Sequence, residues 1–318
     1  MKEIFSRILA VLLLSTGFDL IHRYPGTSGL TLAAESDEGL QPLITTSELI
    51  VGENRFGFGL AKANKLLENA DVQLRIYSLD GPDPHLVAET NALYNSIRTA
   101  ERGESVHRHA DGTSHVHSAD SDVRGLYISR LTFAHPGPWG IKLQARDDSG
   151  SLATAHLTVM VSETSQTPAL SSPAPRSRNL VAADVRDLRQ IDTSQKPDPR
   201  LHRVRIVDAI AQRKPQLIVF ATPQFCTSRM CGPVVEIVRQ LLPEYNKQVA
   251  FAHQEIWQDF ASKKVFPTVE EWRLVSEPWI FIVDSDGIIR AKFEGLVTGR
   301  ELEAALQEVL QLNPSRRH

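Results

Sequence analysis

Hydrophobic and polar residues alternate along three segments in the first half of the chain. The segments are DVQLRIYSL (71–79), WGIKLQARD (139–147) and HLTVMVS (156–162). Successive side chains of a β-strand point to opposite faces, so this period of two predicts strands with one buried face. Turn clusters such as LDGPDP, HPGPWG and DDSG separate such segments, and short strands with these turns favour a β-sandwich over residues 40–163. The predicted apolar face comprises Val72, Leu74, Ile76, Trp139, Ile141, Leu143, Ala145, Leu157, Val159 and Val161.

Residues 199–318 instead alternate between helical and strand patterns. Apolar residues recur at helical spacing in PVVEIVRQLLPEY (233–245) and GRELEAALQEVLQL (299–312). The short apolar runs QLIVFAT (216–222) and QVAFAHQEI (248–256) are typical of buried strands. In PWIFIVDSDGIIRAKFEG, the DSDG turn between two apolar runs predicts a hairpin. Strands that alternate with helices in this way predict an α/β domain.

Two further segments complete the predicted organisation. Residues 164–198 are rich in Pro, Ser and Thr in their first half, which predicts a linker with one short helix. In residues 1–36, Lys2 and Arg7 flank the apolar run Ile8–Phe18, which is short for a membrane span but suits the core of a signal peptide. An uncleaved N-terminal anchor is the alternative. Either way we expect an extracytoplasmic protein of the cell envelope, which touches a membrane only through this segment if it is uncleaved.

Composition and charge narrow the function classes. Of 318 residues, 42% are hydrophobic and 23% are charged, which is typical of a globular protein. The net charge of -3 gives no global electrostatic reason to expect a nucleic-acid partner. The two cysteines cannot form a disulfide-rich scaffold. The chain also lacks a phosphate-binding glycine loop, a serine nucleophile elbow and a zincin motif.

Both cysteines lie in IVFATPQFCTSRMCGPVV, where four residues separate Cys226 from Cys231. Five residues along a regular helix correspond to about 140° of rotation and about 7.5 Å of rise. A disulfide needs Cα atoms about 4.4–6.8 Å apart, so the two cysteines can bridge only if the segment between them is a loop. Pro233 is well suited to the first turn of a helix that starts just after Cys231. The positive end of that helix, together with Arg229, lowers thiol pKa values. The pair is then a reversible redox pair, a structural disulfide or a set of thiolate metal ligands.

The last 120 or so residues, about 199–318, resemble the thioredoxin superfamily in the order of their features. A strand ends at Phe220, a cysteine pair precedes a helix, and Glu277-Pro278 opens an apolar strand before a hairpin and a final helix. The resemblance implies a cis bond at Pro278 beside the cysteines, where Pro278 shapes the groove that binds a partner. The family motif is Cys-x-x-Cys, whereas this chain has Cys-x4-Cys. The distance from Phe220 favours Cys226 as the attacking thiol, whereas the Cys-Gly-Pro string favours Cys231.

Other resemblances suggest neighbouring chemistry. Residues 40–163 resemble immunoglobulin-like modules of bacterial surface proteins, a likeness that carries no catalytic residues. Peroxiredoxins of one type also place a resolving cysteine five residues after the attacking one, but their threonine lies three residues before it and Thr222 lies four before Cys226. Copper chaperones of the Sco type pair two close cysteines with a distant histidine. His253 is the candidate for that ligand here, and a histidine at a strand end without any ligand is the alternative.

A histidine-rich segment stands out in the first half of the chain. ESVHRHADGTSHVHSADSD contains two His-x-His pairs on either side of a turn, formed by His107, His109, His115 and His117. In a hairpin each pair would point to one face, and four imidazoles could converge on copper, nickel or zinc. A solvated polar loop without a metal is the alternative.

The sequence therefore predicts a multidomain chain, with an all-β immunoglobulin-like sandwich followed by an α/β thioredoxin-like domain. The favoured function is thiol–disulfide exchange with protein thiols and disulfides of the envelope, a reaction that requires no cofactor. Cys226 would attack and Cys231 would resolve. The alternative is a copper- or zinc-binding protein without catalysis that uses the cysteine pair, the histidine-rich segment or both. A third reading is an interaction module in which neither set of residues is active.

Overall fold

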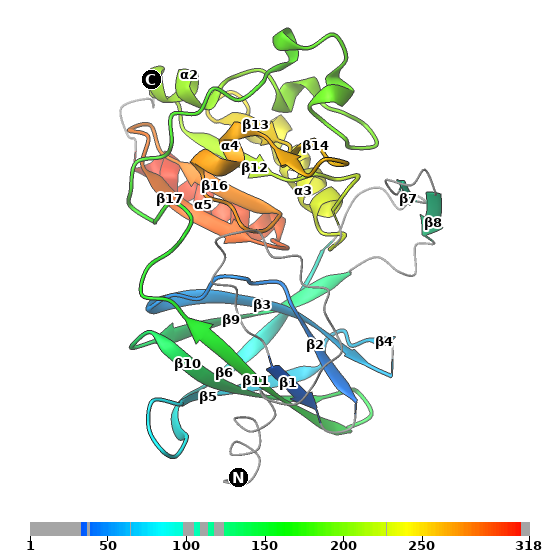
Figure 1. Cartoon of the computed structure of the whole chain (residues 1–318), viewed down its shortest axis with the longest axis vertical. Helices are drawn as coiled ribbons and strands as arrows, with labels where there is room; N and C mark the ends of the chain where they lie inside the picture. Colours follow the sequence, from blue (N-terminus) through cyan, green and yellow to red (C-terminus); the bar gives the residue numbers. More distant parts are fainter. Residues whose placement is uncertain are drawn as a thin grey trace. The chain divides into compact units, whose positions relative to one another are not determined.

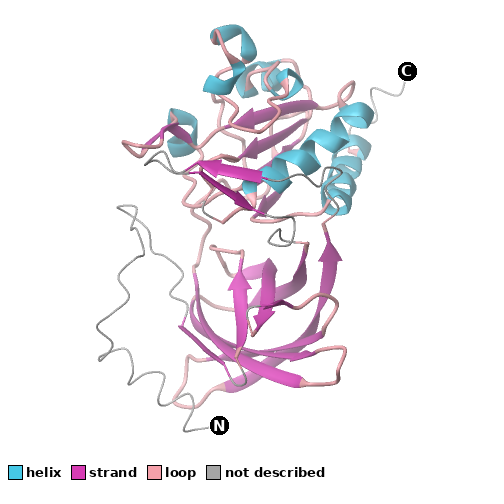
Figure 2. Cartoon of the chain, turned by 90° about the vertical axis from the view of Figure 1, so that its right-hand side faces the viewer, coloured by secondary structure: helices cyan, strands magenta, loops and turns pink. Residues whose placement is uncertain are grey.

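The computed structural model describes residues 33–36, 39–63, 65–97, 105–108, 114–117, 124–226 and 228–312. The chain divides into two compact units, which are shown in Figure 1. The first unit comprises Met1–Asn95 and Gly125–Ser165, and the second comprises Ser96–Arg124 and Gln166–His318. Among the described residues, all helices belong to the second unit, as the colours in Figure 2 show.

The first unit is built on one nine-stranded antiparallel sheet with the order β1-β11-β10-β5-β6-β9-β3-β2, and β4 pairs with β3 outside this path. Its strands are β1 (Ala33–Ser36), β2 (Leu40–Ile44), β3 (Gly52–Lys62), β4 (Lys65–Leu66), β5 (Asp71–Ser78), β6 (His85–Ser96), β9 (Gly125–Phe133), β10 (Gly137–Arg146) and β11 (Leu152–Val161).

The nine-stranded sheet nearly closes on itself like a barrel. The segment between β2 and β3 meets the end of β11, where Ile50 and Ser162 form a parallel bridge. Two backbone hydrogen bonds support that bridge, from Val51 N to Ser162 O at 3.0 Å and from Ser162 N to Leu49 O at 2.8 Å. A curled sheet of this kind encloses its own core, because all of its inward side chains face one another.

The core of the first unit follows the alternation of the sequence. Across the sheet, Ile141 of β10 pairs with Ile76 of β5 on one side and with Leu157 of β11 on the other. All three side chains are at most 2% exposed. The strands therefore lie where the hydrophobic pattern predicts them, and their apolar faces point inward.

The predicted fold class, an immunoglobulin-like sandwich followed by an α/β thioredoxin-like domain, is wrong. The described chain is mostly β, with about 40% strand and 20% helix. The first unit is a single barrel-like sheet, whereas a sandwich needs two sheets packed face to face. Alternation cannot separate the two architectures, because each gives strands with one buried face. In the second unit, two of the helices are only six and five residues long, α2 (Ile206–Ala211) and α4 (Pro267–Glu271).

The second unit is organised around a four-stranded sheet with the order β13-β12-β16-β17. Strands β12 and β13 are parallel, and the other two pairings are antiparallel. Every residue of β12, β13 and β16 is buried, including the polar residues Gln216, His253 and Gln254. The bounds are β12 (Gln216–Phe220), β13 (Ala250–Gln254), β16 (Trp279–Val283) and β17 (Ile289–Glu294).

Two longer helices complete this unit, α3 (Cys231–Tyr245) and α5 (Gly299–Gln311). Thr298 caps α5, and its hydroxyl accepts a hydrogen bond from Glu301 N at 3.2 Å while the Glu301 carboxylate reaches back to Thr298 N. The remaining elements are η2 (Ala182–Asp184), η3 (Leu188–Gln190), η4 (Pro199–Leu201), β14 (Trp257–Asp259), β15 (Lys264–Val265), β7 (Ser105–Arg108) and β8 (Ser114–His117).

The segment 164–198, predicted as a linker, mostly packs into the second unit. Ser177 and Asn179 are buried, with exposed fractions of 1% and 2%. The Asn179 side chain accepts a hydrogen bond from Ile206 N at 2.8 Å, and the indole of Trp272 donates to Ser177 Oγ at 3.0 Å. The side chains of Ser177 and Asn179 therefore hold this part of the segment against the rest of the second unit by hydrogen bonds.

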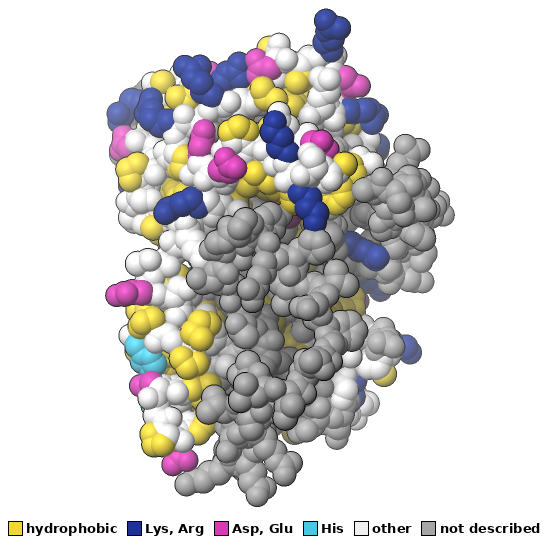
Figure 3. All heavy atoms as spheres, viewed as in Figure 1, with side chains coloured by type: hydrophobic (Ala, Val, Ile, Leu, Met, Phe, Trp, Pro, Cys, Tyr) yellow, Lys and Arg dark blue, Asp and Glu magenta, His cyan; other side chains and the backbone are white. Residues whose placement is uncertain are grey.

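Most of the predicted signal peptide or anchor lies outside the described residues. Its last four residues, Ala33–Ser36, form β1 and pair with β11. Within the described ranges, no helix is both long and apolar enough to cross a membrane. On the face seen in Figure 3, Lys and Arg side chains are spread over the second unit with acidic side chains between them.

Candidate functional site

The two cysteines lie at the junction between a loop and a helix. Strand β12 ends at Phe220, Cys226 lies in the following loop, and Cys231 is the first residue of α3. The loop turns back at Arg229, whose φ of 59° is in the left-handed region and whose N–H donates to Cys226 O at 3.2 Å. This turn brings the fifth residue back toward the first, which a regular helix would not do.

The sulfur atoms converge on a carboxylate. The Sγ atoms of Cys226 and Cys231 and an oxygen of Glu277 all lie within 4.8 Å of one another. The Cys231 thiol donates to Glu277 Oε2 at 3.4 Å, and Cys226 Sγ lies 3.1 Å from Ser228 Oγ. Both thiols are free, with exposed fractions of 4% for Cys226 and 0% for Cys231. The less buried thiol is therefore the one in the loop.

The environment separates the pKa values of the two thiols. The neighbouring Cys231 side chain is the main cause that lowers the pKa of Cys226 to about 6, and burial opposes it only in part. The hydroxyl of Ser228 and backbone N–H groups at the start of α3 add to this effect. Burial raises the pKa of Cys231 well above its ordinary value, and the neighbouring groups Cys226 and Glu277 raise it further. At neutral pH, Cys226 is a thiolate and Cys231 a thiol.

Glu277 is a functional candidate to which the sequence pattern assigned no role. Burial and then the Cys226 charge raise the pKa of Glu277 to about 8, so its carboxyl is mostly protonated at neutral pH. Its Oε2 also accepts a hydrogen bond from Thr222 N at 2.8 Å. The Glu277–Pro278 bond is cis, as the resemblance implied, and Pro278 is buried at the start of β16. The one feature of the sequence that could have indicated a role for Glu277 is its position as a charged residue directly before Pro278.

We expect Cys226 to react with iodoacetamide at a half-maximal rate near pH 6, because its thiolate forms with a pKa of about 6. Cys231 should stay unmodified up to about pH 9, because burial keeps it protonated. Alkylation rates measured across pH by mass spectrometry of the two peptides test this. Cys231→Ala removes the side chain that most lowers the pKa of Cys226 and should move the midpoint upward. A midpoint above about pH 8 in the wild-type chain would contradict the expectation.

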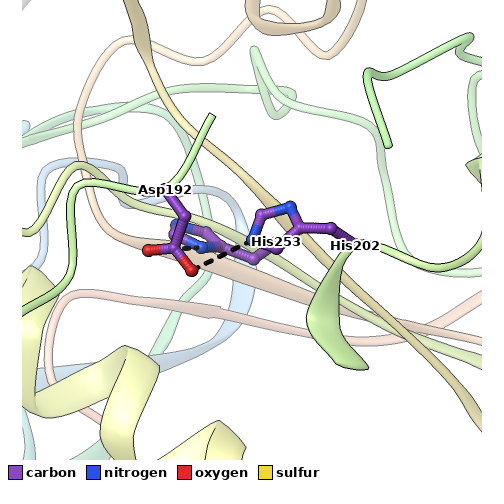
Figure 4. Close-up of side chains that lie close together, drawn as sticks. All are labelled: Asp192, His202 and His253. Carbon is purple, nitrogen blue, oxygen red and sulfur yellow. Dashed lines mark hydrogen bonds and ion pairs between the residues drawn. The ribbon is translucent and has the colours of Figure 1, made fainter. Parts of the chain in front are cut away.

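A second cluster of titratable side chains contains His253, which was considered as a ligand beside the cysteines. The structure brings its ring instead to Asp192 and His202, as Figure 4 shows. His253 Nδ1 lies 3.7 Å from Asp192 Oδ1, and His202 Nε2 lies 3.1 Å from Asp192 Oδ2. Asp192 and His202 were missed because one lies in the predicted linker and the other directly after η4, with no motif between them.

Charge is shared unevenly within this cluster. Burial disfavours the imidazolium of His253, but the Asp192 carboxylate 3.7 Å away outweighs burial and raises the pKa of His253 to about 9. Burial also works against the Asp192 carboxylate, yet the two histidines hold its pKa well below the ordinary value. Burial lowers the pKa of His202. At neutral pH the cluster thus contains an aspartate, one charged imidazole and one neutral imidazole.

A single stretch of backbone joins the two clusters. His253 Nε2 lies 2.9 Å from Ala221 O, and the N–H of the next residue, Thr222, donates to Glu277. Among the described residues, two groups of side chains could hold a metal ion: Cys226, Cys231 and Glu277, and separately Asp192, His202 and His253. The second group is independent of the thiols.

The histidine-rich segment forms the hairpin that the sequence predicts, as far as its backbone is described. Strands β7 and β8 pair antiparallel, with His107 opposite His115 and Ser105 opposite His117. His109 lies outside the described residues, as do the side chains of the other three. Metal binding by this segment stays a prediction.

No family model and no curated protein matches the chain. Among solved structures, it is similar to the soluble domain of PmoD from Methylocystis sp. ATCC 49242 (Rockwell), with a TM-score of 0.22 and 11% identity. The match covers 38% of this chain and 90% of the other. So low a TM-score carries no conclusion about fold or function.

Proposed function

We propose that this chain performs thiol–disulfide exchange in the cell envelope, with Cys226 as the attacking thiolate and Cys231 as the resolving thiol. The observation that carries the proposal is the contrast between two adjacent free thiols, one with a pKa of about 6 and one held well above its ordinary pKa. Exchange requires a thiolate to attack and a second sulfur within reach to release the product. Envelope location rests on the apolar run near the N-terminus.

The reaction follows from the arrangement. The Cys226 thiolate attacks one sulfur of a partner disulfide, which forms a mixed disulfide and releases the partner's other sulfur as a thiolate that takes up a proton. Loss of the Cys226 charge removes one cause of the raised pKa of Glu277, while burial, the larger cause, remains. The Glu277 carboxyl gives its proton to the released partner thiolate, and the resulting carboxylate accepts the proton of Cys231, which contacts it. The Cys231 thiolate then attacks Cys226 Sγ and releases the second partner sulfur as a thiolate, which takes the proton that Glu277 received. The partner gains two electrons, and this chain ends with a Cys226–Cys231 disulfide.

Pro278 fits a positioning role in this proposal. It follows directly after Glu277, whose carboxylate contacts Cys231, and its carbonyl accepts a hydrogen bond from Gly295 N at 2.9 Å. That bond fixes the start of β16 beside the thiols. Pro278 would thus shape the surface on which a partner segment lies.

The test is the reduction potential of the cysteine pair, measured by thiol trapping across a series of redox buffers. A potential between about −120 and −270 mV matches working oxidoreductases and supports the proposal. A value below about −300 mV indicates a structural disulfide. If no bridge forms at any potential, the exchange proposal fails.

Metal binding is the second candidate, favoured by the convergence of Cys226, Cys231 and Glu277 within 4.8 Å. Two sulfurs and one carboxylate oxygen could bind copper or zinc, with thiolates as the dominant ligands. The histidine-rich hairpin would be a further site. Metal content of the purified protein, compared before and after Cys226→Ser and Cys231→Ser, separates this candidate from exchange.

A further inference from the structure

Three separate segments bring nitrogen and oxygen ligands together in the interior of the second unit. Asp192 lies after η3, His202 follows η4 and pairs with Ala252 of the sheet, and His253 belongs to β13. The exposed fractions of the three residues are 0%, 1% and 1%. Buried groups of this kind need partners for every polar atom, because unpaired polar atoms in a protein interior are costly.

The ring of His253 is oriented as in a metal ligand. Its Nε2 lies 2.9 Å from Ala221 O, and a carbonyl only accepts, so Nε2 carries the hydrogen. Nδ1 then faces Asp192 Oδ1 at 3.7 Å, a longer separation than a good hydrogen bond, and Nδ1 has no hydrogen-bond partner among the described residues. Metal-binding histidines usually donate their other N–H to a carbonyl or carboxylate, which fixes the ring in this way.

The separations between donor atoms suit a tetrahedral ion. Two donors that are each about 2.0–2.1 Å from zinc lie about 3.3–3.4 Å apart. His202 Nε2 lies 3.1 Å from Asp192 Oδ2, and His253 Nδ1 lies 3.7 Å from the other oxygen, Oδ1. One donor atom from each of the three residues lies within 4.8 Å of the other two, a spacing that a small ion between them would shorten. Figure 4 shows both rings directed at the same carboxylate.

We propose that Asp192, His202 and His253 form a buried binding site for a divalent transition-metal ion of the zinc class. Two imidazoles and one carboxylate are ligands that zinc prefers. Asp192 supplies the negative charge of the site. Binding replaces a proton on His253 Nδ1. This inference is independent of the proposed exchange reaction.

The ion would connect the segment 190–202 to the sheet and, through it, to the loop of the cysteines. Thr193 follows the ligand Asp192, and its hydroxyl accepts a hydrogen bond from Gln224 N at 3.2 Å. Gln224 lies two residues before Cys226. The site is closed to solvent, so its role is to hold these segments in place rather than to activate a substrate.

The experiment uses the full chain in which the other candidate ligands are removed, by Cys226→Ser, Cys231→Ser and four His→Gln changes at 107, 109, 115 and 117. This parent chain is incubated with Zn²⁺ or Co²⁺ and dialysed, and its metal is counted by mass spectrometry. We expect about one ion per chain. Adding His253→Gln should lower that to less than about a tenth. His135→Gln, at a histidine of the first unit, is the matched control and should change nothing.

The same parent also provides readouts that do not depend on one variant's folding. Bound Co²⁺ should give the visible absorption of a tetrahedral nitrogen and oxygen site, and Zn²⁺ should raise the thermal unfolding midpoint. If His253→Gln does not fold, His202→Gln and the Co²⁺ spectrum of the parent decide. A parent that retains no metal overturns the proposal, and so does equal retention after His253→Gln or His202→Gln. If the parent retains no metal, the cluster is an ion pair in which His253 carries a proton in place of a metal ion.

Discussion

Replacing Cys226 with serine should reduce the rate of disulfide reduction by on the order of 10³-fold or more. Cys226 is the thiol with a pKa of about 6 and is therefore the thiolate at neutral pH, whereas Cys231 is held protonated by burial. A serine hydroxyl does not attack disulfides under these conditions. The rate of insulin disulfide reduction with dithiothreitol measures the loss.

The partner variant has a different expected outcome. Cys231→Ser retains the attacking thiolate but cannot resolve the intermediate, so a mixed disulfide with the substrate should accumulate on non-reducing gels. Ser228→Ala is the control, since it removes one contact of Cys226 at 3.1 Å and leaves both sulfurs in place. Its rate should stay within about tenfold of wild type. Trapping by Cys226→Ser instead would reverse the assigned roles, and unchanged rates in both cysteine variants would rule out exchange by this pair.

Replacing Trp272 with alanine should destabilise the second unit by about 3–5 kcal/mol. The Trp272 side chain is fully buried, and its ring lies 5.1 Å from Phe220 and 4.6 Å from Phe281 between ring centroids. Its indole N–H also donates to Ser177 at 3.0 Å. The substitution therefore leaves a large cavity and removes a buried hydrogen bond.

Urea unfolding followed by far-ultraviolet circular dichroism measures this change. Leu312→Ala is the control, because Leu312 is 58% exposed and its loss should change the free energy of unfolding by less than about 0.5 kcal/mol. A cost below about 1 kcal/mol for Trp272→Ala would mean that the aromatic cluster does not carry the stability of this unit.

The sequence predicts a strand or a helix start well where residues close by in the chain determine it. Val72, Leu74 and Ile76 alternate with polar residues, and their strand lies at the expected place. The helix start at Cys231 similarly agrees with the one predicted from Pro233, just after Cys231. Strand order is different, because alternation is the same in a sandwich and in a nearly closed sheet. The fold class was wrong for that reason.

The candidate site could be predicted only in part. Cys226 and Cys231 are close in sequence, but Glu277 is 46 residues from Cys231 and meets it only through the fold. Asp192 and His253 lie in segments that were predicted to be a linker and a separate domain. Composition favours the linker, because Pro and Ser are common in tethers. It cannot show that Asn179 and Asp192 are buried with hydrogen bonds.

The packing of the segment 166–198 sets the smallest piece of the chain that can hold the thiols in position. A fragment that begins at residue 199, where the alternation of helix and strand patterns starts, would lack Ser177 beneath Trp272 and Asp192 beside His253. It would expose the apolar side chains that this segment covers and leave the buried His253 ring without the carboxylate that it faces. Any shortened protein meant to carry the exchange chemistry should therefore begin near Gln166.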